Sequence, residues 1–520
     1  MKILLIYPEV PNTFWSLKNA LKFISKKALL PPLGLLTVAA LLPDSFEKKL
    51  IDMNVSPLQD DDIMWADYVF ISAMYIQKDS AAKVIERCNK LKTKVVAGGP
   101  LFTSFPELIS GIDHLILNEA EITLPEFLND MAANKLKHIY KTEAKADMRN
   151  SPLPLWKLAE IKKYGMMGLQ YSRGCPFDCD FCDITQLHGH KVRTKTTDQI
   201  INELESLYFN KWRGDVFFVD DNFIGKRNRL KRELLPAIIE WMKKRKHPFC
   251  FSTQSSIDLV DDEELMTLMA LAGFDGVFIG LESPNDMSLE ECNKKQNIGR
   301  NYVEAIKKIQ RFGMQVQAGF IIGFDNDQPN VFNKLINMIQ SSGIVTAMVG
   351  LLNAPPGTKL YQKLQNEKRL ADPPTGDNTD CSMNFIPKMD IRELRSGYLK
   401  VLNTIYSQKY FCKRIRTFLE SYNFHNKTKY KINYRDVMAF LKSIWRIGIL
   451  GKGKIYYWML IIWSFRDFRR VPLAVRYSIF GFHFRAVLKN IYNNMKDRDV
   501  CSIEEIDSRK TFNNSTIFTK

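Results

Sequence analysis

The sequence predicts an α/β protein with an N-terminal doubly wound sheet, a central partial barrel of six strand–helix units, and a mostly helical C-terminal region. Short apolar runs alternate with helical patterns in two successive series, which is typical of parallel sheets. Beyond the second series the sequence becomes helical, aromatic and basic. We therefore divide the 520 residues into the N-terminal domain at 1–145, a linker at 146–165, the barrel at 166–362, the helical region at 363–496 and a flexible tail at 497–520.

The N-terminal domain contains five candidate strands, with helical patterns such as Ser80–Leu91 between them. The strands are Lys2–Tyr7, Lys49–Met53, Tyr68–Ala73, Lys94–Gly98 and His114–Asn118. Ligands of such sheets bind at the carboxyl ends of the strands. The candidate ligand-binding residues are therefore Asp52-Met53-Asn54, Ser72-Ala73-Met74, Gly98-Gly99-Pro100 and Asn118-Glu119-Ala120-Glu121.

The second series follows a linker that carries Pro152 and Pro154. Its six candidate strands are Met167–Ser172, Asp215–Asp221, Phe249–Ser256, Gly276–Ser283, Gln315–Phe324 and Ile344–Asn353. A helical segment follows each of the first five, as at Asp198–Tyr208, Asn228–Lys244 and Asp261–Ala272. Six such units predict a partial barrel whose site lies at the carboxyl ends of its strands.

Three cysteines, Cys175, Cys179 and Cys182, follow the first barrel strand at the spacing C-x3-C-x2-C. Thiolates ligate iron–sulfur clusters, and three of them leave one iron of a four-iron cluster open to a small molecule. Gly174 and Pro176 favour a bend in this loop. A zinc ribbon would need a second C-x2-C pair, which this sequence lacks. Disulfides would need an oxidising compartment.

This loop resembles that of the radical S-adenosylmethionine (SAM) superfamily, including the aromatic Phe181 before the last cysteine. The resemblance implies a [4Fe-4S] cluster whose open iron binds the amino and carboxyl groups of SAM. It also implies reductive cleavage of SAM to a 5′-deoxyadenosyl radical, which abstracts hydrogen from the substrate. An external electron donor such as a flavodoxin or ferredoxin, and a reduced cytoplasmic setting, follow from it.

The resemblance also assigns SAM-binding positions after successive barrel strands. Asp220, Asp221 and Asn222 stand where the family often has Gly-Gly-Glu for the SAM amino group, and they offer acceptors for an ammonium. The alternative there is a simple turn. The remaining assigned positions are Phe181, Ser252, Gln254, Glu282 and Gly323. For Ser252 and Gln254 an ordinary buried hydrogen bond is the alternative.

The N-terminal strand ends resemble the cobalamin-binding domain that precedes many radical SAM enzymes. Ser72 and the pair Gly98-Gly99 match its pattern, and a small glycine pair would let a flat ligand approach the backbone. Asn54 stands where the cobalt-ligating histidine would be. The resemblance thus implies cobalamin without that ligand; the alternative is a purely structural α/β domain.

From Ile51 to about Tyr398 the chain resembles class B radical SAM enzymes with a cobalamin-binding domain, in the branch that includes the hopanoid C-2 methylase. The shared segments are Ala-Gly-Gly-Pro, Asn-Glu-Ala-Glu, Val-Asp-Asp-Asn-Phe-Ile-Gly, a Pro-Gly-Thr turn and Asn384–Met389. This predicts methyl transfer through cobalamin to an unactivated carbon of a hydrophobic or polycyclic substrate. The alternatives are a radical SAM oxidase or cyclase, a methylthiotransferase and a non-enzymatic binding module. The methylthiotransferase would need three N-terminal cysteines, and only Cys88 precedes the trio.

The net charge of +17 favours acidic partners, a lipid surface or nucleic acid, and charge alone does not distinguish them. We expect a small-molecule substrate and no nucleic acid.

Segment 444–470 is apolar and aromatic with flanking cations, so it could lie in a membrane interface or pack against the barrel. No apolar run reaches the ~20 residues of a membrane span. The N-terminus predicts a strand rather than a signal peptide. We expect a cytoplasmic protein, with the membrane surface as a further location.

Overall fold

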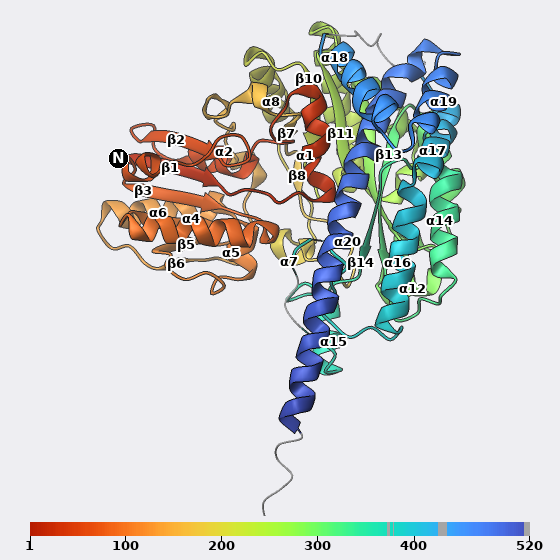
Figure 1. Cartoon of the computed structure of the whole chain (residues 1–520). Helices are drawn as coiled ribbons and strands as arrows, with labels where there is room; N and C mark the ends of the chain where they lie inside the picture. The colour runs from red at the N-terminus through yellow and green to blue at the C-terminus, as the bar shows by residue number, and fades with distance from the viewer. Residues whose placement is uncertain (372–374, 378, 425–433, 514–520) are drawn as a thin grey trace, which may run out of the picture.

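The computed structural model describes residues 1–371, 375–377, 379–424 and 434–513, with side chains up to residue 493. Figure 1 shows the N-terminal domain on one side of the barrel and the C-terminal helices on the other. No helix within the described ranges combines the length and apolar content that a membrane crossing requires.

The N-terminal domain is a six-stranded parallel sheet with helices on both faces, as predicted. Its order is β2-β1-β3-β4-β5-β6. The strands are β1 Lys2–Tyr7, β2 Glu47–Asp52, β3 Tyr68–Ser72, β4 Lys94–Gly98, β5 His114–Ile116 and β6 Ile139–Tyr140. The two-residue strand β6 is too short to produce an alternating pattern, which explains why the sequence did not predict it. One face packs against α2 (Leu33–Leu41) and α6 (Ala120–Ala132). The other packs against α3 (Asp60–Met64), α4 (Lys78–Lys90) and α5 (Pro100–Ser104).

The central part is an open parallel barrel with the strand order β14-β13-β12-β11-β10-β7, which confirms the six predicted units. The strands are β7 Met167–Leu169, β10 Gly214–Phe218, β11 Phe249–Ser255, β12 Phe274–Glu282, β13 Gln315–Ile322 and β14 Ala347–Leu351. The helices that cover it are α8 Thr197–Phe209, α10 Leu235–Lys244, α11 Glu263–Ala272, α13 Tyr302–Arg311 and α14 Val331–Ser342.

The first predicted barrel strand is broken in two. β7 ends at Leu169, and β8 (Ser172–Arg173) leaves the sheet to pair antiparallel with β9 (Arg193–Thr194). The cause is Asp220, whose carboxylate accepts hydrogen bonds from the backbone N–H groups of Tyr171 (3.0 Å) and Ser172 (2.5 Å). These donors would otherwise continue the strand ladder.

Two predicted segments differ from expectation. The linker at 146–165 is closely packed, because Trp156 and Tyr164 are buried and the Tyr164 hydroxyl donates to Asp52 Oδ2 at 2.9 Å. The predicted flexible tail is helical up to Asn513, since α20 runs over Val471–Asn513. No glycine or proline after Gly481 interrupts that helix. The rest of the predicted tail, 514–520, lies outside the described residues.

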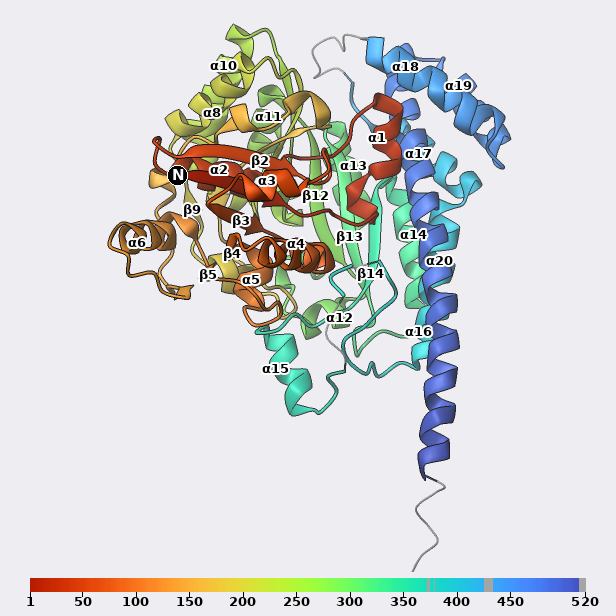
Figure 2. The ribbon, with the colours of Figure 1, turned by 60° about the vertical axis from the view of Figure 1, so that its left-hand side comes forward.

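The C-terminal helices close the open edge of the barrel. They are α16 Ile391–Tyr406, α17 Gln408–Ser421, α18 Tyr434–Ser443, α19 Lys454–Ser464 and α20. On the edge strand β14, the carbonyls of Val349 and Ala347 accept hydrogen bonds from the hydroxyls of Tyr398 (3.0 Å) and Tyr406 (2.6 Å). Covering an edge strand in this way removes a site for unwanted pairing. Figure 2 shows α20 beside these helices, with the N-terminal helix α1 (Lys18–Leu21) against it.

Candidate active site

The cysteine loop, residues 174–192, leaves the barrel through β8 and returns through β9. Gly174 has φ +96°, and a Cβ there would lie 2.8 Å from the carbonyl oxygen of Lys191, so a side chain would disrupt the turn. Within the loop, the Cys182 N–H donates to the Cys179 carbonyl at 3.1 Å. The Asp180 N–H donates to the carbonyl of Cys292 at 3.1 Å, beyond the carboxyl end of β12. The loop is thus fixed against the carboxyl edge of the barrel, where the sequence placed it.

The three thiols have the chemistry that a cluster requires. None of them is in a disulfide; Cys179 is buried, while Cys175 and Cys182 are half-buried. Burial raises the pKa of all three thiols, that of Cys182 to about 12, and the charge of Cys179 adds to the increase at the other two. Within the described part of the chain, no three His, Cys, Asp or Glu side chains converge around one metal ion. A four-iron cluster does not need such convergence, since each thiolate binds a different iron.

Lys294 brings positive charge to the thiols. Its Nζ lies 2.9 Å from Glu282 Oε1 and 5.8 Å from the centre of the Phe181 ring. Burial disfavours its ammonium, but the charges of Glu282 and Cys179 outweigh this and raise the Lys294 pKa. Nearby, Gln296 Nε2 lies 3.9 Å from Cys179 Sγ. Sequence reasoning missed Lys294 and Gln296. The signal that could have found them is the polar run 293–297 after the fourth barrel strand.

The three polar residues after β10 have different surroundings. Asp220 has no exposed surface; its Oδ1 also accepts from the Ser172 hydroxyl at 2.5 Å, and burial raises its pKa to about 7. Asp221 Oδ2 accepts from the Gly174 N–H at 2.8 Å and lies 2.9 Å from His188 Nδ1. Both carboxylates therefore hold the base of the cysteine loop instead of facing an open site.

Asn222 differs from these two aspartates. Its Oδ1 is buried and has no hydrogen-bond partner among the described residues, while its Nδ2 donates to Ser256 Oγ at 3.2 Å. Asn222 also lines a cavity of ≈ 500 Å³, together with Pro176 and Phe177 of the cysteine loop. Of the three predicted acceptors after β10, Asn222 is thus the one whose acceptor oxygen has no hydrogen-bond partner among the described residues.

The other predicted SAM residues lie along the following strands. Ser252 and Gln254 alternate on β11 with the buried Phe251 and Thr253, so they lie on the opposite face of the strand from these two residues and are half-buried. Glu282 ends β12 with φ +61° and is paired with Lys294. Gly323 directly follows β13 with φ +107°. Phe181 packs edge-on against Phe324, with the ring centres 6.5 Å apart.

Asn54, which stands at the predicted histidine position, is fully engaged within the N-terminal domain. Its Nδ2 donates to Asp52 Oδ1 at 2.8 Å and to the Pro8 carbonyl at 3.2 Å. Its Oδ1 accepts from the Val10 N–H at 2.8 Å. These bonds anchor the loops after β1 and β2, and they occupy the atoms that a metal would need.

The Gly98-Gly99 pair is required by packing within the protein. A Cβ on Gly98 would lie 2.7 Å from the carbonyl oxygen of Ile116 on β5. Gly99 has φ +89°, and its Cβ would collide with the hydroxyl of Ser72. The expected reason for these glycines, close approach of a flat ligand, is therefore not needed to explain them.

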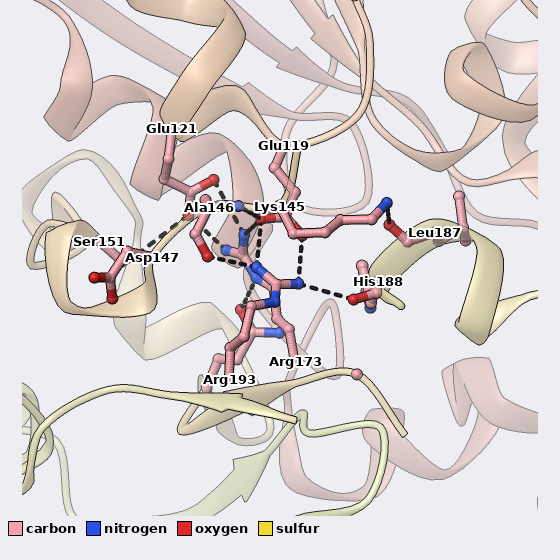
Figure 3. Close-up of polar contacts among 12 residues, drawn as sticks. Glu119, Glu121, Lys145, Ala146, Asp147, Ser151, Arg173, Leu187, His188 and Arg193 are labelled. Atoms are coloured by element: carbon pink, nitrogen blue, oxygen red, sulfur yellow. Dashed lines mark hydrogen bonds and ion pairs between the residues drawn. The ribbon is translucent and has the colours of Figure 1, made fainter. Parts of the chain in front are cut away.

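A buried ion network joins the N-terminal domain to the cysteine loop (Figure 3). Arg173 forms a bidentate pair with Glu121, at 2.7 and 3.1 Å. Arg193 forms a second one with Glu119, at 2.6 and 2.8 Å. Burial disfavours both carboxylates, but the two arginines outweigh it and hold the pKa of Glu119 and of Glu121 below the usual value. The sequence identified the two glutamates as strand-end residues but not their partners.

Three family models match consecutive parts of the chain. The B12 binding domain matches residues 24–128, and the Radical SAM superfamily matches residues 169–339. The Domain of unknown function DUF4070 matches residues 358–497.

Two relatives match nearly the whole chain. An uncharacterised methyltransferase of Synechocystis sp. is 39% identical over 463 residues, which are 88% of this chain and 86% of the relative. The hopanoid C-2 methylase of Rhodopseudomonas palustris is 32% identical over 469 residues, 88% of each chain. The chain belongs to the cobalamin-dependent radical SAM methyltransferases. The family resemblance inferred from the sequence is therefore confirmed.

The fold of this methyltransferase matches solved structures of cobalamin-dependent enzymes. The SAM radical enzyme OxsB, solved with aqua-cobalamin and SAM, superposes with a TM-score of 0.61 at 16% identity, over 96% of this chain and 81% of OxsB. The methyltransferase TsrM from Kitasatospora setae gives 0.56 at 16% identity, over 72% and 77% of the two chains. The cofactors of the family are a [4Fe-4S] cluster, SAM and cobalamin. The three thiols, which form no disulfide and lie near Lys294, fit the cluster. The side-chain amide of Asn54 already forms hydrogen bonds through both its oxygen and its nitrogen, which fits a cobalamin that receives no ligand from this side chain.

Proposed function

We propose that this methyltransferase transfers a methyl group to an unactivated carbon of a hydrophobic, polycyclic substrate. The observation that carries the proposal is the buried ion network, which joins the carboxyl edge of the cobalamin-binding domain directly to the cysteine loop. When bound, the cofactors would supply the chemistry: two electrons from the external donor would be needed for each turnover, one to split SAM at the cluster and one to restore cobalamin, which would carry the methyl group. The substrate carbon would lose one hydrogen atom, which leaves in 5′-deoxyadenosine, and would gain the methyl group of a second SAM molecule, which leaves as S-adenosylhomocysteine.

Around SAM and the cluster, each residue has a proposed task. Cys175, Cys179 and Cys182 hold three irons, and Lys294 offsets the negative charge of their thiolates. Asn222 accepts a hydrogen bond from the SAM ammonium through its Oδ1, which has no hydrogen-bond partner among the described residues; the cavity that Asn222 lines supports this role. We reassign Asp220 and Asp221 from direct SAM contact to support of the loop, because their oxygens already accept hydrogen bonds. We assign the remaining contacts with SAM to the other predicted residues, Phe181, Ser252, Gln254, Glu282 and Gly323.

At the N-terminal domain, we propose that cobalamin lies over the strand ends that carry Ser72, Gly98 and Gly99. Asn54 shapes the adjoining loops and leaves the cobalt without a ligand from its side chain, which its three hydrogen bonds support.

The test is an anaerobic reaction with a polycyclic lipid such as a hopanoid, in which 5′-deoxyadenosine and methylated product are both measured. We expect Cys179→Ala to abolish iron loading and both products. Cys292→Ala is the matched control, because Cys292 is a buried thiol near Cys179 whose Sγ donates to the Leu289 carbonyl at 3.5 Å, and it should retain its iron. Deoxyadenosine with an oxidised but unmethylated substrate would instead support the oxidase or cyclase alternative.

We further propose that the substrate comes from a lipid surface, which the enzyme contacts through segment 434–470, that is, the predicted segment 444–470 together with the preceding helix α18. On α19, Tyr457, Leu460 and Ile461 are buried against the body of the protein, whereas Ile455, Met459 and Ile462 are 61–68% exposed. Packing against the protein therefore accounts for one side of this helix only. Large exposed apolar patches mark interaction sites. Further exposed apolar side chains of the segment are Val437, Leu441, Trp445, Ile449, Leu450, Phe465 and Phe468.

Charge favours an anionic lipid surface over an apolar protein partner. Lys452, Lys454 and Arg466 are exposed beside these apolar residues. Cations that flank an interfacial helix attract anionic headgroups while its apolar side enters the acyl boundary.

Flotation with vesicles of phosphatidylglycerol and phosphatidylcholine tests this contact. The wild-type protein should float with the vesicles, and the combined variant Ile455→Ser, Met459→Ser, Ile462→Ser should lose most of that binding. Phe209→Ser is the control, because Phe209 is 68% exposed on α8, outside the segment. A wild-type protein that stays entirely in the unbound fraction would refute the proposed contact.

A further inference from the structure

The ion network between the N-terminal domain and the cysteine loop, here called the glutamate–arginine clamp, consists of Glu119, Glu121, Arg173 and Arg193 (Figure 3). The two carboxylates are 5% and 7% exposed and the two guanidinium side chains 14% each. Besides the two bidentate pairs, Arg173 Nη1 lies 3.5 Å from Glu119 Oε2, so the four charges form one connected group. Bidentate arginine–carboxylate pairs fix orientation as well as distance.

The hairpin that closes the cysteine loop depends on this clamp. β8 and β9 have two residues each, and Arg173 lies directly opposite Arg193 in their register. Like charges directly opposite each other destabilise a strand pair, and an isolated two-stranded ribbon is marginal by itself. The carboxylates that neutralise the pair come from the other domain. The base of the loop is therefore held from both domains: by these carboxylates and, within the barrel, by Asp220 and Asp221.

The N-terminal domain holds both ends of the cluster-binding stretch. Arg173 precedes Cys175 by two residues, and helix α7 (Ile184–His188) begins two residues after Cys182. Lys145 Nζ donates to the Leu187 carbonyl of α7 at 2.8 Å, and Arg193 Nη2 donates to the His188 carbonyl at 2.9 Å. On the opposite side, Glu119 and Glu121 stand just beyond the carboxyl end of β5.

Stability alone is a weak reason for such a network. Buried ion pairs lose solvation energy that roughly cancels their attraction, and apolar residues of similar volume often stabilise as well. What apolar residues lack is the directional, bidentate geometry.

We propose that the clamp is a positioning device that sets the separation of cobalt and cluster, so that the radical and the methyl donor act on the same substrate carbon. The proposal rests on the proposed function for its catalytic consequence. Without the clamp, SAM cleavage continues but becomes uncoupled from methyl transfer. Displacements of about 1 Å cost enzymes up to roughly a hundredfold in rate.

The test uses the fully loaded enzyme and two measurements. The first is the dipolar coupling between cobalt(II) cobalamin and the reduced cluster, observed by electron paramagnetic resonance. The second is the amount of methylated product per 5′-deoxyadenosine. For Glu121→Gln we expect a weaker or broader coupling and a ratio lowered about tenfold or more, with iron and cobalamin content retained. Glu126→Gln, which removes an exposed carboxylate of the same helix α6, should change neither.

If Glu121→Gln does not fold, Arg173→Lys replaces it, because lysine keeps the charge but loses the bidentate geometry. Unchanged coupling and ratio in these single variants would overturn the proposal. The two proposals can fail separately. If the wild-type enzyme forms no methylated product but its cobalt–cluster coupling still changes in Glu121→Gln, the proposed function is refuted and the positioning role of the clamp is supported.

Discussion

Asp220, Asp221 and Asn222 are adjacent in the sequence, yet the fold gives them separate tasks. The aspartates bind the backbone of the cysteine loop, and only Asn222 keeps an acceptor oxygen without a partner among the described residues. The sequence predicted that polar groups would follow this strand, because apolar runs and their ends are visible in it. It could not predict which group stays available, since that depends on Tyr171, Ser172 and Gly174 folding back toward the strand end.

Asn222 should therefore matter for SAM affinity and not for the cluster. For Asn222→Ala we expect the KM for SAM to rise about tenfold, the loss expected for one hydrogen bond to a charged group, with unchanged iron content. Asn222→Asp keeps an acceptor and should change the KM much less. Equal losses in both variants, or lost iron in either, would count against this role.

At the scale of elements, the alternation of apolar runs located β1 and β4 to the residue and the other predicted strands to within a few residues. It did not show the break between β7 and β8, or β9, because these depend on the carboxylate of Asp220 and on two-residue pairings without periodicity. Helix α20 likewise extends past Asp497, where polar composition suggested a flexible tail. Periodicity thus predicts long elements well, whereas short ones depend on tertiary contacts.

The bend at Gly174 gives a test at this scale. Gly174→Ala should lower iron loading severely, because its Cβ would meet the Lys191 and Gly189 carbonyl oxygens at 2.8 and 2.9 Å and distort the loop. Overall helix content, measured by circular dichroism, should stay the same. Gly299→Ala is the matched control: Gly299 also has positive φ, at +70°, but an added Cβ there meets nothing within 4 Å. Iron loss in both variants would mean that general strain, and not the loop contact, is the cause.

At the scale of the whole molecule, the sequence predicted both α/β domains, their order and their cofactors, and the family comparisons confirm these. It did not predict how the domains meet. Glu119 and Arg193, for example, are 74 residues apart, and neither strand pattern nor composition relates them. Their contact brings the ligand edge of the cobalamin-binding sheet to the base of the cysteine loop. The arrangement of the domains, more than any single residue, supports the proposed transfer of a methyl group to a substrate that lies between the two cofactors.

The account depends on a four-iron cluster that this loop holds by three thiolates, with one iron open to SAM. Mössbauer spectra of protein reconstituted with ⁵⁷Fe, recorded before and after SAM is added, test this most directly. We predict a four-iron spectrum in which one iron subsite changes when SAM binds while the other three do not. A four-iron spectrum that does not change when SAM is added, or protein that retains no cluster, would contradict the account.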